Sequence, residues 1–442
     1  MTTMVNTGPA VDRALALHII ERLGSAGVPP VAGIEAINVG NATLLRLLRE
    51  EYFETLLRVG SAFKLVEAHY GGGKTHFLRM VQRMAWQYGF AAALVELSPR
   101  ECPYDDPRAV YGQVARRLGL QPASPLEDGA SGIAELVRRT VDERIERALE
   151  ESDEHGEREL RWVVQRAMQR ELRRAPCESP SYRSAVMALV NATLEDDHAI
   201  ARLAEGWLLG ESPPMAELRP LGINEAITRS NGFTMLRSLT QMVVALGHAG
   251  TALLFDEVDR TLSVSSRRTE AIGDNLRQVI DLCGEARLPR TLFLYAVPPE
   301  FMRQVVPDYP ALEQRLRSPV AFSERSPQAP IIPLDRLDLA PQALLEALAE
   351  RIRHVFEQAR GVSLDASLQA ANATRLAEAC TLREFDVNHR RLFVKVWVAA
   401  LQGQWSDGQR LLTPAEVDAL LEGQRSATVA DAAEAASAFD DF

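Results

Sequence analysis

The sequence predicts an α/β fold built on a parallel sheet, with a large helical insertion and a helical C-terminal part. Short, mainly apolar segments such as "SAFKLVEA", "TALLFD" and "RTLFLYAV" are typical of parallel strands, which are buried on both faces. A mixed-charge helical pattern occupies about 121–230, and amphipathic helices follow Leu334. A chain of 442 residues, 46% hydrophobic and 25% charged, is long enough to bury the core that this fold requires.

The first apolar segment leads into a glycine loop, "VEAHYGGGKTHFL", at 66–78. The loop matches the phosphate-binding pattern GxxxxGK[ST], in which backbone N–H groups face a triphosphate. In that pattern Lys74 reaches the outer phosphates and the hydroxyl of Thr75 binds Mg²⁺. A helix pattern starts at the lysine, and its N-terminal dipole would face the phosphates. The nucleotide-binding residues that we predict are Gly71, Gly72, Gly73, Lys74, Thr75 and His76.

Ala68 departs from this pattern, because it stands where the first glycine belongs. A small residue can replace that glycine if its φ stays negative. The chain has three lysines against 46 arginines, and a compact ammonium suits a tight phosphate loop better than a guanidinium. The alternative is a glycine turn followed by an accidental GKT.

The second apolar segment, "TALLFDEVDR" at 251–260, ends in Asp256 and Glu257. This is the Walker B form, in which the aspartate helps to hold Mg²⁺ and the glutamate activates the attacking water. The two motifs, in this order, predict an ATP-hydrolysing P-loop NTPase of the ASCE class, which has an added strand between the two motif strands.

Two later features predict parts of an AAA+ ATPase. The segment "RTLFLYAVPPEFM" at 290–302 forms a further strand, on which Tyr295 is the candidate polar sensor. Arg315 and Arg317 end a helix where an arginine finger would reach the γ-phosphate of a neighbouring subunit, and we favour Arg315. A finger in trans implies a homo-oligomer. A purely structural role for these arginines remains open.

Asp256 lies 182 positions after Lys74, which exceeds what one helix–strand–helix connection needs, and this excess predicts the insertion. Residues 131–175 contain ten arginines and eleven acidic residues, and we expect no pattern of interleaved aromatics that would support base stacking. This balance favours an exposed or partner-binding helical face over a nucleic-acid groove. After the core, Arg383 is the candidate nucleotide-sensing arginine of the helical lid. The predicted segments are an N-terminal helical segment at 1–60, the ATPase core at 61–335 with its insertion at 121–230, the lid at 336–423, and an acidic disordered tail at 424–442.

Several classes of protein are disfavoured. No apolar run approaches the roughly 18 residues of a membrane span, and the N-terminus lacks the pattern of a signal peptide, so we expect a cytoplasmic protein without membrane contact. The four cysteines contain no CxxC pair and predict reduced thiols. A net charge of −11 opposes nonspecific DNA binding unless basic residues cluster locally.

The sequence resembles the BREX-system ATP-binding proteins, the P-loop family that includes the BrxC and BrxD components. The resemblance lies in "ERLGSAGVPPVAGIEAINVG", "YGGGKTHFLRMVQRMAWQYGF", "VELSPRECPYDDPRAVYGQV", "TALLFDEVDR" and "YAVPPEFM", and the length is nearer the BrxD type. It implies an AAA+-like ATPase that uses ATP and Mg²⁺ and acts with other proteins of a bacterial anti-phage defence complex. Ala68 and the lack of a better polar sensor than Tyr295 are departures that bear on the hydrolysis rate.

Two alternatives stay open at this point. The first is a DNA-binding ATPase or loader similar to the initiator proteins, with DNA as a partner. The second is a non-hydrolysing scaffold, in which ATP only orders the lid and the inserted helices recruit a partner.

Overall fold

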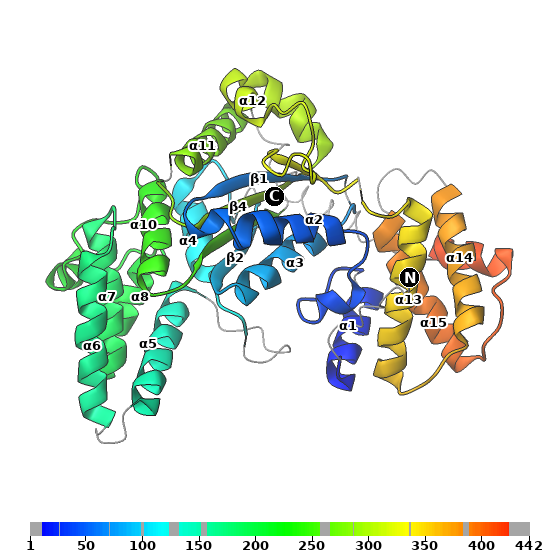
Figure 1. Cartoon of the computed structure of the whole chain (residues 1–442), viewed down its shortest axis with the longest axis horizontal. Coiled ribbons are helices and arrows are strands. Elements are labelled where there is room, and N and C mark those ends of the chain that lie inside the picture. The colour runs from blue at the N-terminus through cyan, green and yellow to red at the C-terminus, as the bar shows by residue number, and fades with distance from the viewer. Residues whose placement is uncertain are drawn as a thin grey trace, which may run out of the picture. The chain divides into compact units, whose positions relative to one another are not determined.

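The computed structural model describes residues 11–25, 27–69, 71–98, 101–122, 132–151, 157–256, 266–285, 287–335, 337–382 and 389–423. The chain divides into two compact units. The first contains residues up to Thr43, residues Ala68–Met80 and residues from Leu334 onward; the second contains Leu44–Glu67 and Val81–Pro333. Figure 1 shows both units, which are described separately below.

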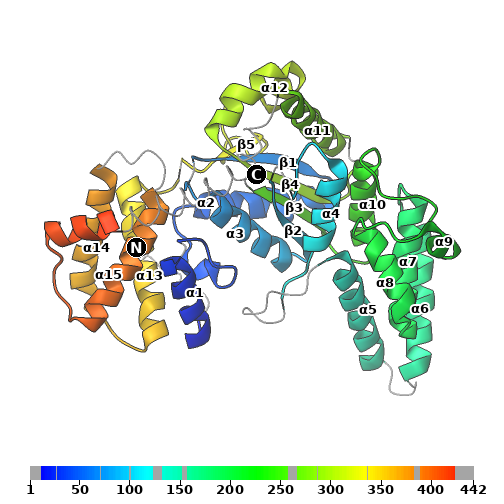
Figure 2. The same ribbon diagram turned by 180° about the vertical axis from the view of Figure 1, so that it is seen from behind.

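The second unit is built on a five-stranded parallel sheet with the order β2-β3-β4-β1-β5 (Figure 2). The strands are β1 (Ala62–Glu67), β2 (Phe90–Glu96), β3 (Gly250–Asp256), β4 (Thr291–Val297) and β5 (Ile331–Pro333). Strands β3 and β4 are buried along their whole length, which explains why the sequence shows them as uninterrupted apolar runs. Strand β4 lies between β1 and β3, so the predicted added strand between the two motif strands is confirmed.

The register brings the carboxyl ends of the strands to one edge of the sheet. Glu96 is paired with Asp256, Phe255 with Tyr295, and Glu67 with Val297. Adjacent strands are about 4.8 Å apart, so the end of β3 lies about 10 Å from the end of β1, with β4 between them. In open parallel sheets this carboxyl edge is where ligands bind.

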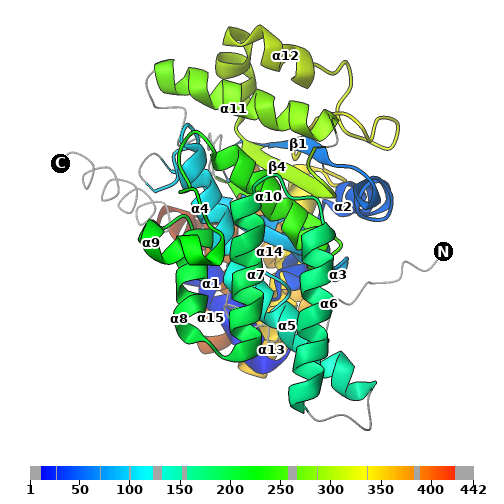
Figure 3. The same ribbon diagram turned by 90° about the vertical axis from the view of Figure 1, so that its left-hand side faces the viewer.

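Helices cover this sheet and extend beyond it. Those that flank the strands are α4 (Pro107–Arg117), α10 (Gly232–Ala245) and α11 (Ser266–Gly284), and α12 (Pro310–Leu316) packs on α11. The segment between α4 and α10 carries α5 (Ile133–Glu150), α6 (Glu157–Arg174), α7 (Pro180–Glu195), α8 (His198–Leu208) and the short α9 (Met215–Leu218). Helices α5, α6, α7 and α8 run alongside one another and pack together (Figure 3). This bundle accounts for the excess length between the two nucleotide motifs.

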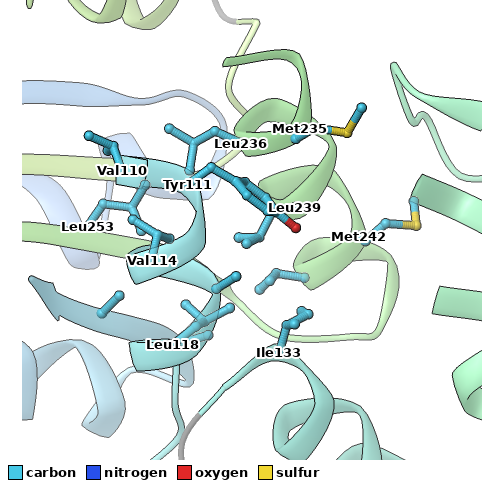
Figure 4. Packing of buried hydrophobic residues seen from close by; sticks show 14 of the residues in the cluster. Val110, Tyr111, Val114, Leu118, Ile133, Met235, Leu236, Leu239, Met242 and Leu253 are labelled. Carbon is cyan, nitrogen blue, oxygen red and sulfur yellow. The ribbon is translucent and has the colours of Figure 1, made fainter. Parts of the chain in front are cut away.

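One continuous hydrophobic core joins the sheet to the bundle. In Figure 4, Val110 and Val114 of α4 lie near Leu253 of β3, and Tyr111 faces Leu239 of α10. The Tyr111 hydroxyl donates to the carbonyl of Leu208 at 2.6 Å, which ties α8 to α4. The inserted helices are therefore anchored on the ATPase core by a shared hydrophobic interior. All four cysteines are free thiols, as predicted.

The first unit is helical and has its own core. Helix α1 (Arg13–Ser25) packs against α13 (Pro341–Arg360) and α15 (His389–Ser406), and α14 (Ala366–Leu382) packs against both C-terminal helices. Helix α13 starts with proline at its first turn and ends at Gly361, whose φ of 66° is the left-handed conformation that favours glycine. The N-terminal helix thus completes the C-terminal helical unit, which the predicted segment 1–60 did not anticipate.

Candidate nucleotide-binding site

The glycine loop joins the end of β1 at Glu67 to the start of α3 (Lys74–Gln87). Gly71 and Gly73 have φ values of 74° and 91°, a conformation that side chains with a Cβ rarely adopt. Gly72 has no such φ, but a Cβ on it would lie 2.8 Å from the Cβ of Ala68 and 2.9 Å from the carbonyl oxygen of His69. Each of the three glycines is therefore required by the local geometry, for two different reasons.

Ala68 fits its position without strain. Its backbone is not among the described residues with positive φ, and its side chain is fully buried. The condition under which a small residue can replace the first glycine of the motif is therefore met. The methyl group of Ala68 instead takes the space beside Gly72. Alanine at position 68 therefore fits best when position 72 has no Cβ.

Lys74 is the first residue of α3 and is buried. Its ammonium donates to the carbonyl oxygens of Ala68 at 3.0 Å and His69 at 3.4 Å, within its own loop. The loop thus holds a positive charge at the N-terminus of a 14-residue helix, where several backbone N–H groups lack an intrahelical acceptor. This combination fits a bound anion such as a phosphate group. Thr75 follows in the first turn of the same helix.

His76 lies half-buried in the next position of α3. Its Nε2 is 2.9 Å from the Oδ1 of Asn38, which follows the 3₁₀ helix Ile34–Ile37. Burial, together with the charges of Arg390 and Arg79, lowers the pKa of His76 to about 4. The imidazole is therefore neutral at physiological pH, and its contact to Asn38 positions the N-terminal segment beside α3 without adding charge.

Arg390 is a site residue that the sequence did not reveal. It lies in the first turn of α15, and its guanidinium donates to the carbonyl oxygen of Gly72 across 318 positions of sequence. Burial lowers its pKa, which still leaves the guanidinium charged. A second positive charge thus lies at the glycine loop beside that of Lys74. The predicted sensing residue, Arg383, lies outside the described residues.

Asp256 ends β3 and is 3% exposed. Its position at the carboxyl edge of the sheet, separated from the end of β1 by the single strand β4, is the arrangement expected for a Walker B aspartate. The predicted water-activating residue, Glu257, lies outside the described residues. No group of three or more His, Cys, Asp or Glu side chains that could hold a metal ion occurs among the described residues.

Tyr295 does not occupy a sensor position. Its side chain is 1% exposed and stacks on Phe255 with ring centroids 4.5 Å apart, while its hydroxyl is 2.5 Å from that of Tyr104. Burial raises the pKa of Tyr295 well above its ordinary value. The side chain of Tyr295, the candidate for a polar sensor, therefore lies in the core.

Arg315, the favoured arginine finger, is engaged within its own chain. Its guanidinium forms a two-point ion pair with Asp281 of α11, with Nη2 2.9 Å from Oδ2, and Nη1 donates to the carbonyl of Ala311. Arg317, at the end of the same helix, is exposed and has no ion pair to a described carboxylate. In this structure Arg315 fastens α12 to α11.

These features define an α/β protein with a five-stranded parallel sheet, an architecture consistent with a P-loop NTPase. A family model described as "BREX system ATP-binding protein BrxC/D" matches residues 11–402, nearly the whole chain. The chain therefore belongs to the family of BREX system ATP-binding proteins, as the sequence resemblance predicted. Searches of curated proteins and of solved structures each returned no match. Within the described helices, none has both the length and the apolar character needed to cross a bilayer.

Proposed function

We propose that this chain is a cytoplasmic AAA+-like ATPase that binds ATP with Mg²⁺ at its glycine loop and hydrolyses it within a BREX-type anti-phage defence system. The single observation that carries the proposal is the loop itself, which holds Lys74 and Arg390 at the N-terminus of α3. Family membership supports ATP as the nucleotide. The family description names neither ATP hydrolysis nor the roles of individual residues, and both are part of the proposal.

The loop residues would bind and orient the triphosphate. The backbone N–H groups of Gly71, Gly72 and Gly73 and the ammonium of Lys74 would replace their present contacts with phosphate oxygens. Mg²⁺, when bound, would neutralise charge on the β- and γ-phosphates. The hydroxyl of Thr75 and the carboxylate of Asp256 have the chemistry to hold it, since hard cations prefer oxygen ligands.

The carboxylate that follows β3 would activate water. Glu257 comes directly after Asp256 in the sequence. A carboxylate there would accept the proton of the attacking water while Lys74 stabilises charge on the γ-phosphate. Arg315 or Arg317 would supply a finger to a neighbouring subunit of a homo-oligomer. The exposure of Arg317 favours it, because Arg315 would first have to leave Asp281.

The helices α13–α15 would act as a nucleotide-responsive lid. Arg390 is placed to report on the nucleotide, because a phosphate that enters the loop competes with the Gly72 carbonyl for the same guanidinium. Exchange of ATP for ADP would change that competition and so the position of α15. Contacts with other proteins of the defence system could then follow the nucleotide state.

The test compares ATP binding and turnover by the purified wild-type protein and two variants. Lys74→Ala should lose ATP binding measured by calorimetry, because the loop loses its compact charge. Glu257→Gln should bind ATP normally and turn over at least a hundredfold more slowly, in the range typical for loss of general base catalysis. Arg325→Ala, which replaces an exposed arginine without an ion pair to any described residue, serves as the matched control. Normal affinity in Lys74→Ala or normal turnover in Glu257→Gln would refute the respective assignment.

A second function, a non-hydrolysing nucleotide-gated scaffold, is favoured by one observation. Strand β4 is buried throughout, and its polar member Tyr295 is committed to the core, so the strand presents no polar sensor. For this function, the wild-type protein should bind ATP without turnover even when partner proteins of the system are added. Turnover that disappears in Glu257→Gln would exclude it.

A further inference from the structure

The inserted bundle separates its charges between two neighbouring helices. Helix α5 has four arginines and five acidic residues, whereas α6 has six arginines and three glutamates. The acidic residues that balance the charge of the arginines in residues 131–175 lie mainly on α5 and in the connection between α5 and α6. Helix α6 is therefore basic within a protein whose net charge is −11.

Four of the six arginines of α6 share one exposed face. Leu160, Val164, Met168 and Leu172 form its buried side against α5 and α7. The opposite side is a stripe at intervals of three and four residues, which we call the basic stripe. Its members are Arg158, Trp162, Arg166, Arg170 and Arg173. Over 15 residues at 1.5 Å each, the stripe extends about 22 Å along the helix.

The arginines of the stripe are available for a partner. The ion pairs of α6 involve other residues: Arg161 pairs with Asp196, and Glu171 pairs with Arg144 at 2.8 Å. Within the described part of the chain, no carboxylate pairs with an arginine of the basic stripe. Glu171 lies off this face, whereas helical phase places the exposed Glu159 on it, so this face carries four arginines and one glutamate.

Trp162 adds an aromatic surface to the basic stripe. Its side chain is 54% exposed, and the guanidinium of Arg166 lies 4.7 Å from the ring centroid. The adjacent Val163 is 49% exposed, so this part of the helix also leaves apolar area in water. Stacking on the ring holds the Arg166 side chain in place, which lowers the entropy lost when its N–H groups bind an oxygen acceptor.

We propose that the basic stripe of α6 binds the phosphate backbone of duplex DNA. Planar guanidinium groups bind phosphate oxygens with two parallel hydrogen bonds, and a row of them on a straight helix matches a regular array of anions. Figures 1 and 2 show α6 on the side of the bundle away from the sheet, and every residue of the basic stripe is exposed. The contacts are to phosphates and carry no sequence preference. The attraction is local, which allows it to act despite the negative net charge.

The test measures fluorescence anisotropy of a labelled 30-base-pair duplex titrated with the full-length protein at 50–300 mM KCl. Each phosphate contact contributes about −0.9 to the slope of log K against log salt. Arg166→Gln/Arg170→Gln should therefore reduce the magnitude of the slope by about 1.8 and weaken binding about 60-fold at 0.1 M salt. The matched control, Arg147→Gln/Arg202→Gln, removes two exposed arginines from α5 and α8 and should leave the slope unchanged.

Three results would overturn the proposal. Wild-type protein that does not bind the duplex at 50 mM KCl has no such site. An equal loss of affinity in both double variants would assign binding to net charge alone. The wild-type protein could bind labelled poly-glutamate more tightly than the duplex, with the same loss of affinity in Arg166→Gln/Arg170→Gln. That result would indicate that the basic stripe binds an acidic protein and not DNA. Thermal melting and ATP binding at wild-type levels would show that both variants are folded.

Discussion

Substitution of Gly72 by alanine tests the glycine loop through a single methyl group. The φ of Gly72 is not in the left-handed region, so alanine can adopt its backbone conformation. The penalty arises from contacts: the new Cβ would lie 2.8 Å from the Ala68 Cβ and 2.9 Å from the His69 carbonyl oxygen. Ordinary contacts are 3.4 Å or longer, so the backbone at His69 must move by about half an ångström, and overpacking of this kind costs about 1–3 kcal/mol.

The displaced group is also functional. The His69 carbonyl accepts from the Lys74 ammonium at 3.4 Å, so the movement changes the position of that charge. We expect Gly72→Ala to lower the free energy of unfolding by about 1–3 kcal/mol and to weaken ATP binding at least tenfold, which corresponds to about 1.4 kcal/mol. Urea denaturation and calorimetric titration with ATP measure the two effects.

Two further variants identify the cause. Ala68→Gly/Gly72→Ala removes the 2.8 Å contact but keeps the one to the His69 carbonyl, so it should recover part of the lost stability. Gly403→Ala, in α15, adds a methyl group with nothing within 4 Å and should stabilise the protein by about 0.5–1 kcal/mol. A Gly72→Ala protein that unfolds and binds ATP like the wild type would refute the described loop geometry.

Three other predictions concern ionisable side chains. If Arg390 contacts the γ-phosphate, Arg390→Ala should weaken ATP binding about tenfold and ADP binding less, as measured by calorimetry. Equal losses of affinity for both nucleotides would contradict that role. His76 has its pKa lowered from 6.5 to about 4, so the unfolded chain binds more protons between these values and stability falls as pH drops through this window. Melting temperatures at pH 7.5 and 5 should show this fall in wild type and less of it in His76→Gln; identical pH dependence would exclude the imidazole as its source. Lys64 donates to the carbonyls of Pro327 and Ala329, and burial lowers its pKa to about 7. Lys64→Met should cost about 1–3 kcal/mol in urea denaturation, because two acceptors lose their donor, and unchanged stability would show that water replaces the ammonium.

Local patterns predicted the elements of the site that follow one another along the chain. The strand, loop and helix around Lys74 require only short-range geometry, and apolar runs identified the strands because a parallel sheet is buried on both faces. The prediction that alanine can occupy position 68 also needed only one local condition, a negative φ at that residue. The strand order was predictable because the Walker B form of this sequence is typical of folds that have an added strand between the two motif strands. The condition on Ala68 and the strand order are both met in the structure.

Long-range contacts were not predictable in the same way. Arg390 and Gly72 are 318 residues apart, and nothing in the local pattern around Arg390 distinguishes it from 45 other arginines. Tyr295 looked like a sensor because it is a polar residue in an apolar strand, whereas its partner Tyr104 satisfies the hydroxyl inside the core. A residue type indicates which chemistry is available, but its tertiary partners decide whether that chemistry is exposed.

The arginines of α6 show how averaging can conceal a surface. Ten arginines and eleven acidic residues over 131–175 suggested a balanced face, and the aromatic residue among them went unused. Helical phase changes that conclusion, because side chains three and four positions apart share a side and the others do not. Once Leu160 and Val164 are fixed as the buried side of α6, Arg158, Trp162 and Arg166 must lie together on the other. Charge must therefore be counted over one face of a helix, since a partner meets only that face.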